Sequence, residues 1–107
     1  MSYKIMRLAV FFDLPTNTKK ERRIATKFRK ILLDDGFDML QYSVYTRICA
    51  NRDIADKHMM RIQKIAPDVG SVRILYLTEH QFATMKILTG EKTVQEKLIK
   101  PSQLSFF

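Results

Sequence analysis

A run of apolar and β-prone residues near the N-terminus most limits what this chain can fold into. It spans Tyr3 to Pro15 and reads YKIMRLAVFFDLP. Alternate side chains of a β-strand lie on opposite faces, and here both faces are mainly apolar. One face holds Met6, Leu8, Val10, Phe12 and Leu14, and the other holds Ile5, Arg7, Ala9, Phe11 and Asp13. This pattern is typical of an interior strand of a sheet.

Asp13 is the acid at the end of this run, two residues before Pro15. A buried carboxylate is costly unless it meets water or a cation, so the end of the strand should open to solvent or to a bound group. Two interpretations stay open at this point. Asp13 is either a solvated residue that starts a turn, or the functional carboxylate of the protein.

The next two segments give a helix signal and then a strand signal. Thr18 and Glu21 fit a capping box, and apolar spacing predicts a helix over residues 18–35 that stops at Gly36. Residues 37–50 alternate as a strand does. Its core side would hold Leu40, Tyr42, Val44 and Ile48, and its polar, aromatic side Gln41, Ser43, Tyr45 and Arg47.

The second half of the chain continues the alternation. Asn51 caps a helix that ends at Pro67, and residues 72–78 form a strand that is apolar on both faces. A second capping box opens a short helix over residues 78–86, and a brief strand is predicted over 87–90.

The order of these elements predicts an α+β fold. Residues 37–50 exceed the typical five or six residues of one strand, so we expect them to split into two. The result is the ferredoxin-like βαββαβ sandwich, with two helices on one face of a mainly antiparallel sheet. Residues 1–90 would form this domain. Residues 91–107 would be a C-terminal extension, either disordered or with an added strand over 103–107.

The sheet face opposite the helices would stay open. Either the polar side of residues 37–50 lines it, or Ile5, Arg7 and Phe11 do. Apolar side chains on such a face should not stay in water. We therefore expect a homodimer that packs through this face.

Positive charge is concentrated in the first helix. The net charge is +8, from 19 Lys and Arg against 11 Asp and Glu. Residues 19–30 hold seven basic residues and one acid, so the other 95 residues carry only +2. This concentration favours a polyanion such as DNA, RNA or an acidic membrane face, and a solvated helix face is the alternative. The candidate phosphate-binding residues are Lys19, Lys20, Arg22, Arg23, Lys27, Arg29 and Lys30.

Several other classes of protein lack support in the sequence. Cys49 is the only cysteine, which excludes an internal disulfide and a four-cysteine iron–sulfur cluster. His58 and His80 fit no zinc spacing, and we interpret them as structural or surface residues. There is no nucleophile elbow or Gly-rich phosphate loop, and no apolar run long enough to span a bilayer. We expect a cytoplasmic protein with no membrane partner.

A single carboxylate is a sparse magnesium site. Mg²⁺ nevertheless commonly takes only one or two protein carboxylates, with water and phosphate oxygens completing its shell. A two-fold dimer would bring two copies of Asp13 together. Two close carboxylates repel each other, and a shared divalent cation would relieve that repulsion.

Three stretches of the sequence resemble a known family. They are MSYKIMRLAVFFDLPTNTKKERR, DGFDMLQYSVYTRI and TEHQFATMKILTG, in that order, up to about Gly90. They resemble the CRISPR-associated Cas2 family, most closely the subfamily found beside the single-protein Cas9 effector. The resemblance implies a ferredoxin-like homodimer that binds prespacer double-stranded DNA and bridges two dimers of the CRISPR integrase during spacer acquisition. It also implies metal-dependent endonuclease activity on RNA or DNA.

The same resemblance implies roles for particular residues. Asp13 would be the catalytic Mg²⁺ ligand, one from each subunit, and Arg22 and Arg23 would hold nucleic-acid backbone. Phe12, Phe37 and Ser43 would lie near the site. Leu104, Phe106 and Phe107 would form the C-terminal strand that family members add to the partner's sheet or to the integrase.

Three readings of function stay open on the sequence. The chain is a structural nucleic-acid-binding subunit of the acquisition complex in which Asp13 is catalytically idle, a free-standing metal-dependent nuclease, or a free-standing toxin-like endoribonuclease without an integrase partner.

The charge pattern gives a prediction of its own. If the first helix binds phosphates, log affinity for duplex DNA should fall with log salt concentration, with a slope of about −0.9 per phosphate contacted. Neutralising Lys19, Lys20, Arg22 and Arg23 together should flatten that slope in a fluorescence-anisotropy titration. An unchanged slope would place the binding surface elsewhere on the molecule.

Overall fold

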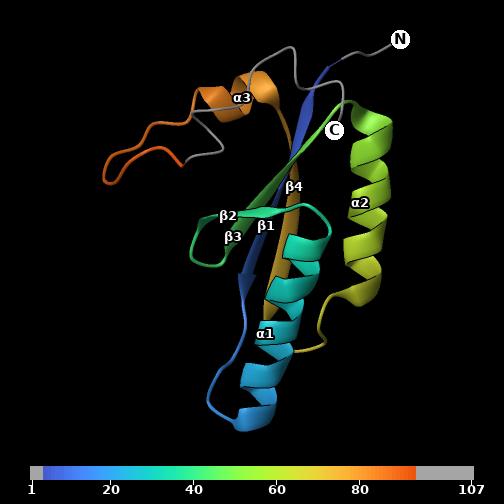
Figure 1. Cartoon of the computed structure of the whole chain (residues 1–107), viewed down its shortest axis with the longest axis vertical. Coiled ribbons are helices and arrows are strands. Elements are labelled where there is room, and N and C mark those ends of the chain that lie inside the picture. Colours follow the sequence, from blue (N-terminus) through green and yellow to red (C-terminus); the bar gives the residue numbers. More distant parts are fainter. Residues whose placement is uncertain (1–3, 94–107) are drawn as a thin grey trace.

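The computed structural model describes residues 4–93, which form an antiparallel sheet with helices packed on it (Figure 1). The strands are β1 (Met6–Asp13), β2 (Asp38–Gln41), β3 (Val44–Cys49) and β4 (Ser71–Thr78). The helices are α1 (Lys19–Asp34), α2 (Arg52–Ile65) and α3 (Glu79–Ala83). The strands lie in the order β2-β3-β1-β4, and every neighbouring pair is antiparallel. This arrangement confirms the predicted ferredoxin-like βαββαβ sandwich, with α3 as an addition.

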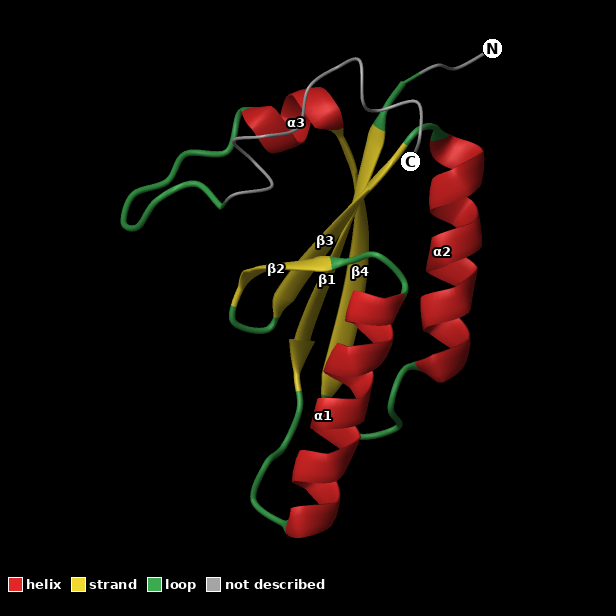
Figure 2. Cartoon of the chain, viewed as in Figure 1, coloured by secondary structure: helices red, strands yellow, loops and turns green. Residues whose placement is uncertain are grey.

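The core lies between the sheet and the two long helices, α1 and α2, which cover the same face of the sheet (Figure 2). From Met6 to Val10 every residue of β1 is buried, so this segment is the interior strand that its sequence predicts. Phe12 points into the core, where its ring meets Phe28 of α1 edge-on at a centroid distance of 5.3 Å. It also meets the ring of Tyr45 at 5.6 Å.

The predicted caps fix where the helices begin. The Thr18 hydroxyl accepts a hydrogen bond from the Glu21 backbone N–H at 3.1 Å, and the Glu21 carboxylate accepts one from the Thr18 N–H at 2.8 Å. At the start of α2, the Asn51 side chain accepts from the Ile54 N–H at 2.9 Å. These caps satisfy N–H groups that have no partner within the helix, and they explain why the sequence located both helices correctly.

Residues 37–50 split into β2 and β3, as expected, but the predicted assignment of their faces is wrong. Tyr45, placed on the polar side, is a core residue with 4% of its surface exposed, whereas Tyr42, placed in the core, is 88% exposed. Tyr42 and Ser43 form the tight turn between the strands, and a register shift interrupts β2. The alternation therefore does not run continuously through the segment. The pairing of β3 with β1 decides which side meets the helices.

Two sets of side chains were predicted for the open face of the sheet, and the structure shows the set that includes Arg7 and Phe11. Arg7 and Phe11 lie opposite the core side chains of β1, and Phe11 is 38% exposed. At one end of this face, α3 packs against the sheet through Phe82, whose ring lies 4.2 Å from the Arg7 guanidinium carbon. Because α3 covers only that end, the part of the face around Phe11 stays open to solvent.

The end of the described chain differs from the prediction. The short helix stops at Ala83 rather than near residue 86, and residues 87–90 form no strand. Leu88 is 92% exposed and Gly90 has a left-handed φ of +101°, so this segment neither extends nor pairs with an edge of the sheet. The predicted extension over 94–107, including Leu104, Phe106 and Phe107, lies outside the described residues. Among the helices that the structure describes, none has the length and apolarity to cross a bilayer.

A cluster of ionisable side chains, of which Asp35 and His58 are largely buried and Arg61 is exposed, joins the end of α1 to α2. The Asp35 carboxylate, 6% exposed, accepts a hydrogen bond from His58 Nδ1 at 2.7 Å and pairs with Arg61. Asp35 follows the C-terminus of α1, where a negative charge opposes the helix dipole. Its two partners on α2 offset that cost. His58 is thus a structural residue, in agreement with its sequence interpretation.

Gly70 allows β4 to begin directly beside the end of β1. Its φ is +75°, and a Cβ at this position would lie 2.3 Å from the Asp13 carbonyl oxygen and 3.1 Å from Leu14 Cα. Both contacts are with backbone atoms, which cannot rotate away as a side-chain tip can. The close approach of these two segments therefore requires glycine.

We predict that Gly70→Ala lowers the free energy of unfolding by about 2 kcal/mol or more, because left-handed strain adds to a backbone clash. Urea denaturation measures this. Gly90→Ala is the matched control, since Gly90 also has positive φ but no atom of the described residues within 4 Å of the point that a Cβ would occupy. It should cost only about 1 kcal/mol. Equal losses in the two variants would show that the contact with Asp13 does not matter.

Candidate functional site

Asp13 lies at the exposed end of β1, in a shallow hollow of about 360 Å³. The last pairing of β1 with β4 sets it opposite Ser71, the first residue of β4. The hollow is lined by Phe11, Phe12, Asp13, Ser43, Val44, Ser71 and Arg73. Three strands therefore meet around one carboxylate, and that carboxylate makes no ion pair or hydrogen bond with any residue between 4 and 93.

Ser43 comes to this hollow because of the tight turn between β2 and β3. It is the only residue other than glycine with positive φ, 64°, among those that the structure describes. Its carbonyl accepts a hydrogen bond from the Phe12 N–H at 3.0 Å, which fixes the turn against the end of β1. The structure thus brings Ser43 and Asp13 together, as the family resemblance implies.

Arg73 is the lining residue that sequence reasoning missed. It lies on β4, two residues along from Ser71 on the same face, and is paired in register with Phe11. In sequence it is a lone arginine inside an apolar strand, SVRILYLT. The only available signal was that break in apolarity, because the sequence does not reveal the register in which β4 pairs with β1.

The two phenylalanines implied near the site have structural positions. Phe37 is 1% exposed within the core and is not among the residues that line the hollow. Phe12 lines the inner edge of the hollow, but its ring packs between Phe28 and Tyr45. Of the implied neighbours, Ser43 alone is both exposed and beside Asp13.

Five of the seven basic residues surround one open groove on α1, of about 470 Å³. They are Lys19, Arg22, Arg23, Lys27 and Lys30. Arg22 also donates a hydrogen bond from Nη1 to the Thr16 carbonyl at 3.1 Å, which holds it near the start of the helix. Arg29 is half-buried and lies outside this groove. In Figure 1, a short loop leads from the end of β1 to the start of α1, and α1 begins beyond that end of the strand.

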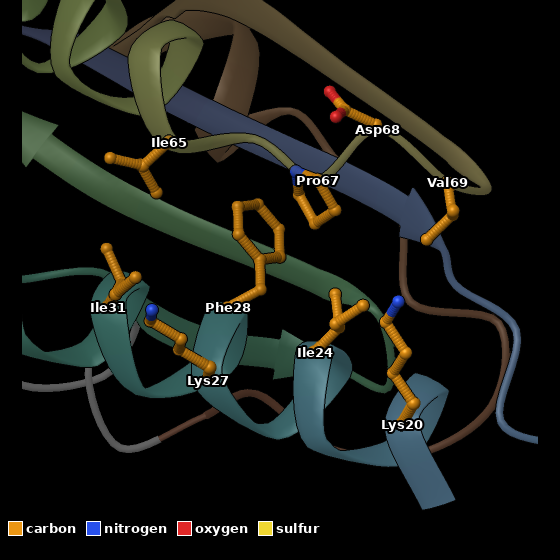
Figure 3. A pocket seen from close by; sticks show the side chains of 9 residues that line it. All are labelled: Lys20, Ile24, Lys27, Phe28, Ile31, Ile65, Pro67, Asp68 and Val69. Carbon is orange, nitrogen blue, oxygen red and sulfur yellow. The ribbon is translucent and has the colours of Figure 1, made fainter. Parts of the chain in front are cut away.

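Lys20 lies on a different depression, between α1 and the segment that follows α2 (Figure 3). This cleft has a volume of about 530 Å³ and is lined mainly by apolar side chains around Phe28 and Pro67. Lys20 and Lys27 stand on its α1 side. Its two lysines share the cleft with Asp68, whereas every charged residue of the α1 groove is basic, so the groove is the more concentrated basic surface.

Other charged groups are engaged in interactions that hold the fold together. Arg7, with 1% of its side chain exposed, donates from Nε to the Glu79 carboxylate at 2.7 Å and so fastens α3 to the sheet. The Tyr76 hydroxyl donates to Asp56 at 2.6 Å, and this bond, together with Arg52, lowers the pKa of Asp56. Burial and the Asp56 contact raise the pKa of Tyr76. Asp13 and Arg73, by contrast, have no such partner in the described part of the chain.

The residues of the hollow fit a magnesium ion only in part. Asp13 supplies a hard carboxylate oxygen and Ser43 a hydroxyl, both suited to Mg²⁺. No group of three or more potential ligands among His, Cys, Asp and Glu exists within residues 4–93. One chain therefore offers a single charged ligand, and a second carboxylate would have to come from another copy.

Comparison with known proteins identifies the family. The sequence model described as "CRISPR associated protein Cas2" matches residues 6–85. A CRISPR-associated endoribonuclease Cas2 from Acidovorax ebreus is 51% identical over 102 residues, covering 95% of this chain and all of that protein. Proteins of the same name from Flavobacterium psychrophilum and Campylobacter jejuni are 48% and 42% identical, over 94% and 97% of this chain and 86% and 73% of theirs. The chain belongs to the Cas2 family.

We predict that Asp13→Asn leaves the free energy of unfolding within about 0.5 kcal/mol of the wild type, because this carboxylate is exposed and unpaired among the described residues. Glu79→Ala should lower it by about 3 kcal/mol, because the buried Arg7 loses its partner. Chemical denaturation compares the two. A large loss in Asp13→Asn would mean that Asp13 has a structural role.

Proposed function

We propose that this chain acts as a homodimer in a CRISPR system, binding nucleic-acid backbone on α1 and hydrolysing a phosphodiester at a pair of Asp13 carboxylates. The observation that carries this proposal is the position of Asp13: exposed, unpaired within the described residues, and at the strand end from which the chain leads into the basic helix. Relatives that are 42–51% identical bear the name endoribonuclease, which supports nuclease chemistry.

The open sheet face supports the dimer. Phe11 and Leu75 lie on this face, 38% and 49% exposed, and the sheet register makes them close neighbours on adjacent strands. Exposed apolar side chains that lie side by side mark a surface that a partner would cover. Packing through this face about a two-fold axis would bring the two copies of Asp13 toward each other, since Asp13 lies on the same face as Phe11.

Mg²⁺ bound between two Asp13 carboxylates would supply Lewis-acid activation of water and stabilisation of the developing negative charge. The residues of this chain would do the rest. Asp13 would hold the ion, and the five basic residues of the α1 groove would bind another part of the backbone. The described residues offer no element that would read bases, so binding should follow backbone and shape rather than sequence.

A second candidate is a purely structural role in spacer acquisition, in which the protein holds prespacer DNA and bridges two integrase dimers. The sparse ligand set favours it, because the described part of one chain offers only one carboxylate in the hollow. The α1 groove would serve this role unchanged. A free-standing toxin-like endoribonuclease is the third reading, and it predicts growth inhibition on expression and no co-purifying integrase.

We predict that Asp13→Asn lowers Mg²⁺-dependent cleavage of single-stranded RNA or duplex DNA by about a hundredfold or more, since it removes the charged ligand. The variant should bind the same nucleic acids in EDTA at least as tightly as the wild type. Labelled-substrate gels and anisotropy measure the two properties. Unchanged cleavage would remove Asp13 from the chemistry.

The two candidate functions separate in cells. If Asp13→Asn abolishes cleavage in vitro but spacer acquisition continues at the wild-type rate, the structural role is the biological one. If acquisition stops although the variant still forms its complex with the integrase, the chemistry at Asp13 is required.

A further inference from the structure

The hollow around Asp13 contains a cation that the proposed function does not use. In the single chain Arg73 lines it at the Asp13 end of the open sheet face, is exposed, and makes no ion pair or hydrogen bond with any described residue. We propose that Arg73 is a phosphate-binding residue, which holds one backbone phosphate of the nucleic acid directly beside Asp13. The inference rests on the proposed function only in taking nucleic acid as the ligand, and not on cleavage.

The sheet register places Arg73 and Asp13 on the same face. Asp13 pairs with Ser71, and Arg73 pairs with Phe11, two residues back along β1. Side chains two residues apart on a strand share a face. The Cα atoms of a diagonal cross-strand pair, such as Asp13 and Arg73, lie about 7–8 Å apart. No salt bridge of 4 Å or less joins the two groups. The two charges thus flank the hollow without neutralising each other.

The chemistry of the lining favours a phosphodiester. A guanidinium presents a planar fork of donors that matches two phosphate oxygens. The hydroxyls of Ser43 and Ser71 line the same hollow and can each donate a hydrogen bond to such an anion. The fixed turn at Ser43, held by its carbonyl contact with the Phe12 N–H at 3.0 Å, keeps one hydroxyl in place.

The shape and charge of the hollow favour a polymer over a small anion. It is shallow and open rather than enclosed, whereas small-molecule sites bury most of their ligand. Asp13 repels any phosphate that approaches it, and Arg73 is the cation of the hollow that can offset this repulsion. Without Arg73, the carboxylate proposed to act on the backbone would push the backbone away.

The experiment measures binding in EDTA, where metal-dependent cleavage cannot occur. Fluorescence anisotropy follows a labelled duplex DNA and a labelled single-stranded RNA across a series of salt concentrations. Arg73→Gln should weaken binding about tenfold and reduce the salt slope by about 0.9 for the duplex and about 0.7 for the single strand. Arg73→Lys should keep the salt slope, because the positive charge stays. It should lose part of the affinity, because lysine lacks the planar fork of donors.

Lys57→Gln is the matched control. Lys57 is an exposed lysine on α2, which covers the opposite face of the sheet. The substitution removes the same charge from the protein and should leave the slope unchanged. If Arg73→Gln behaves like Lys57→Gln, the proposal is wrong. Thermal unfolding and sedimentation establish that each variant keeps the fold and the oligomeric state of the wild type. If Arg73→Gln changes the fold or the oligomeric state, the affinity of Arg73→Lys is compared with the wild type instead.

A double-mutant cycle tests the link to Asp13. Asp13→Asn removes the repulsion between the carboxylate and the phosphate and should tighten nucleic-acid binding in EDTA. The size of this effect on affinity should change by several-fold when Arg73 is also replaced, but not when Lys57 is also replaced. Additive effects of Asp13 and Arg73 would contradict a shared phosphate. The binding result is independent of the nuclease assay. If Arg73→Gln loses affinity, the phosphate site is upheld. If Asp13→Asn still cleaves, the proposed chemistry is overturned, whatever the result for Arg73.

Discussion

The pairing of β1 with strands on both sides is the constraint on which the rest of the structure depends. β1 runs antiparallel to β3 and to β4 along nearly its whole length, and its residues from Met6 to Val10 are buried on both faces. An interior strand of this kind most readily carries an unpaired charge where it leaves the sheet. Asp13 is at that point, and the neighbouring strands bring Ser43 and Arg73 to it.

Local signals made much of the fold predictable. The caps at Thr18 and Asn51 and the length of residues 37–50 located α1, α2 and the β2–β3 turn correctly, since each depends on neighbours in sequence. The faces of β3 were not predictable, because Tyr45 meets the helices only through the register with β1. The same reason hid Arg73: its place in the hollow follows from a pairing between residues about sixty positions apart in sequence.

The charges of the described molecule divide into two groups with different consequences. Arg7 with Glu79, and Asp35 with His58, connect elements that are distant in sequence and have side chains largely removed from solvent. Asp13 and Arg73, in contrast, stay exposed and unpaired within residues 4–93, at the end of the sheet from which the chain enters basic α1. Unpaired charges of both signs around one hollow serve little structural purpose, and they suit a site that binds a phosphate and acts on it.

We propose that one acid per chain becomes a site only when two chains meet. Co-expression of wild-type and Asp13→Asn subunits in equal amounts, with free exchange, tests it through the specific cleavage activity of the mixture. A site shared across the two-fold axis predicts about one quarter of the wild-type activity, because only homodimers of wild type carry both carboxylates. About half of the wild-type activity would show that each subunit acts alone, and would contradict a site shared by two subunits.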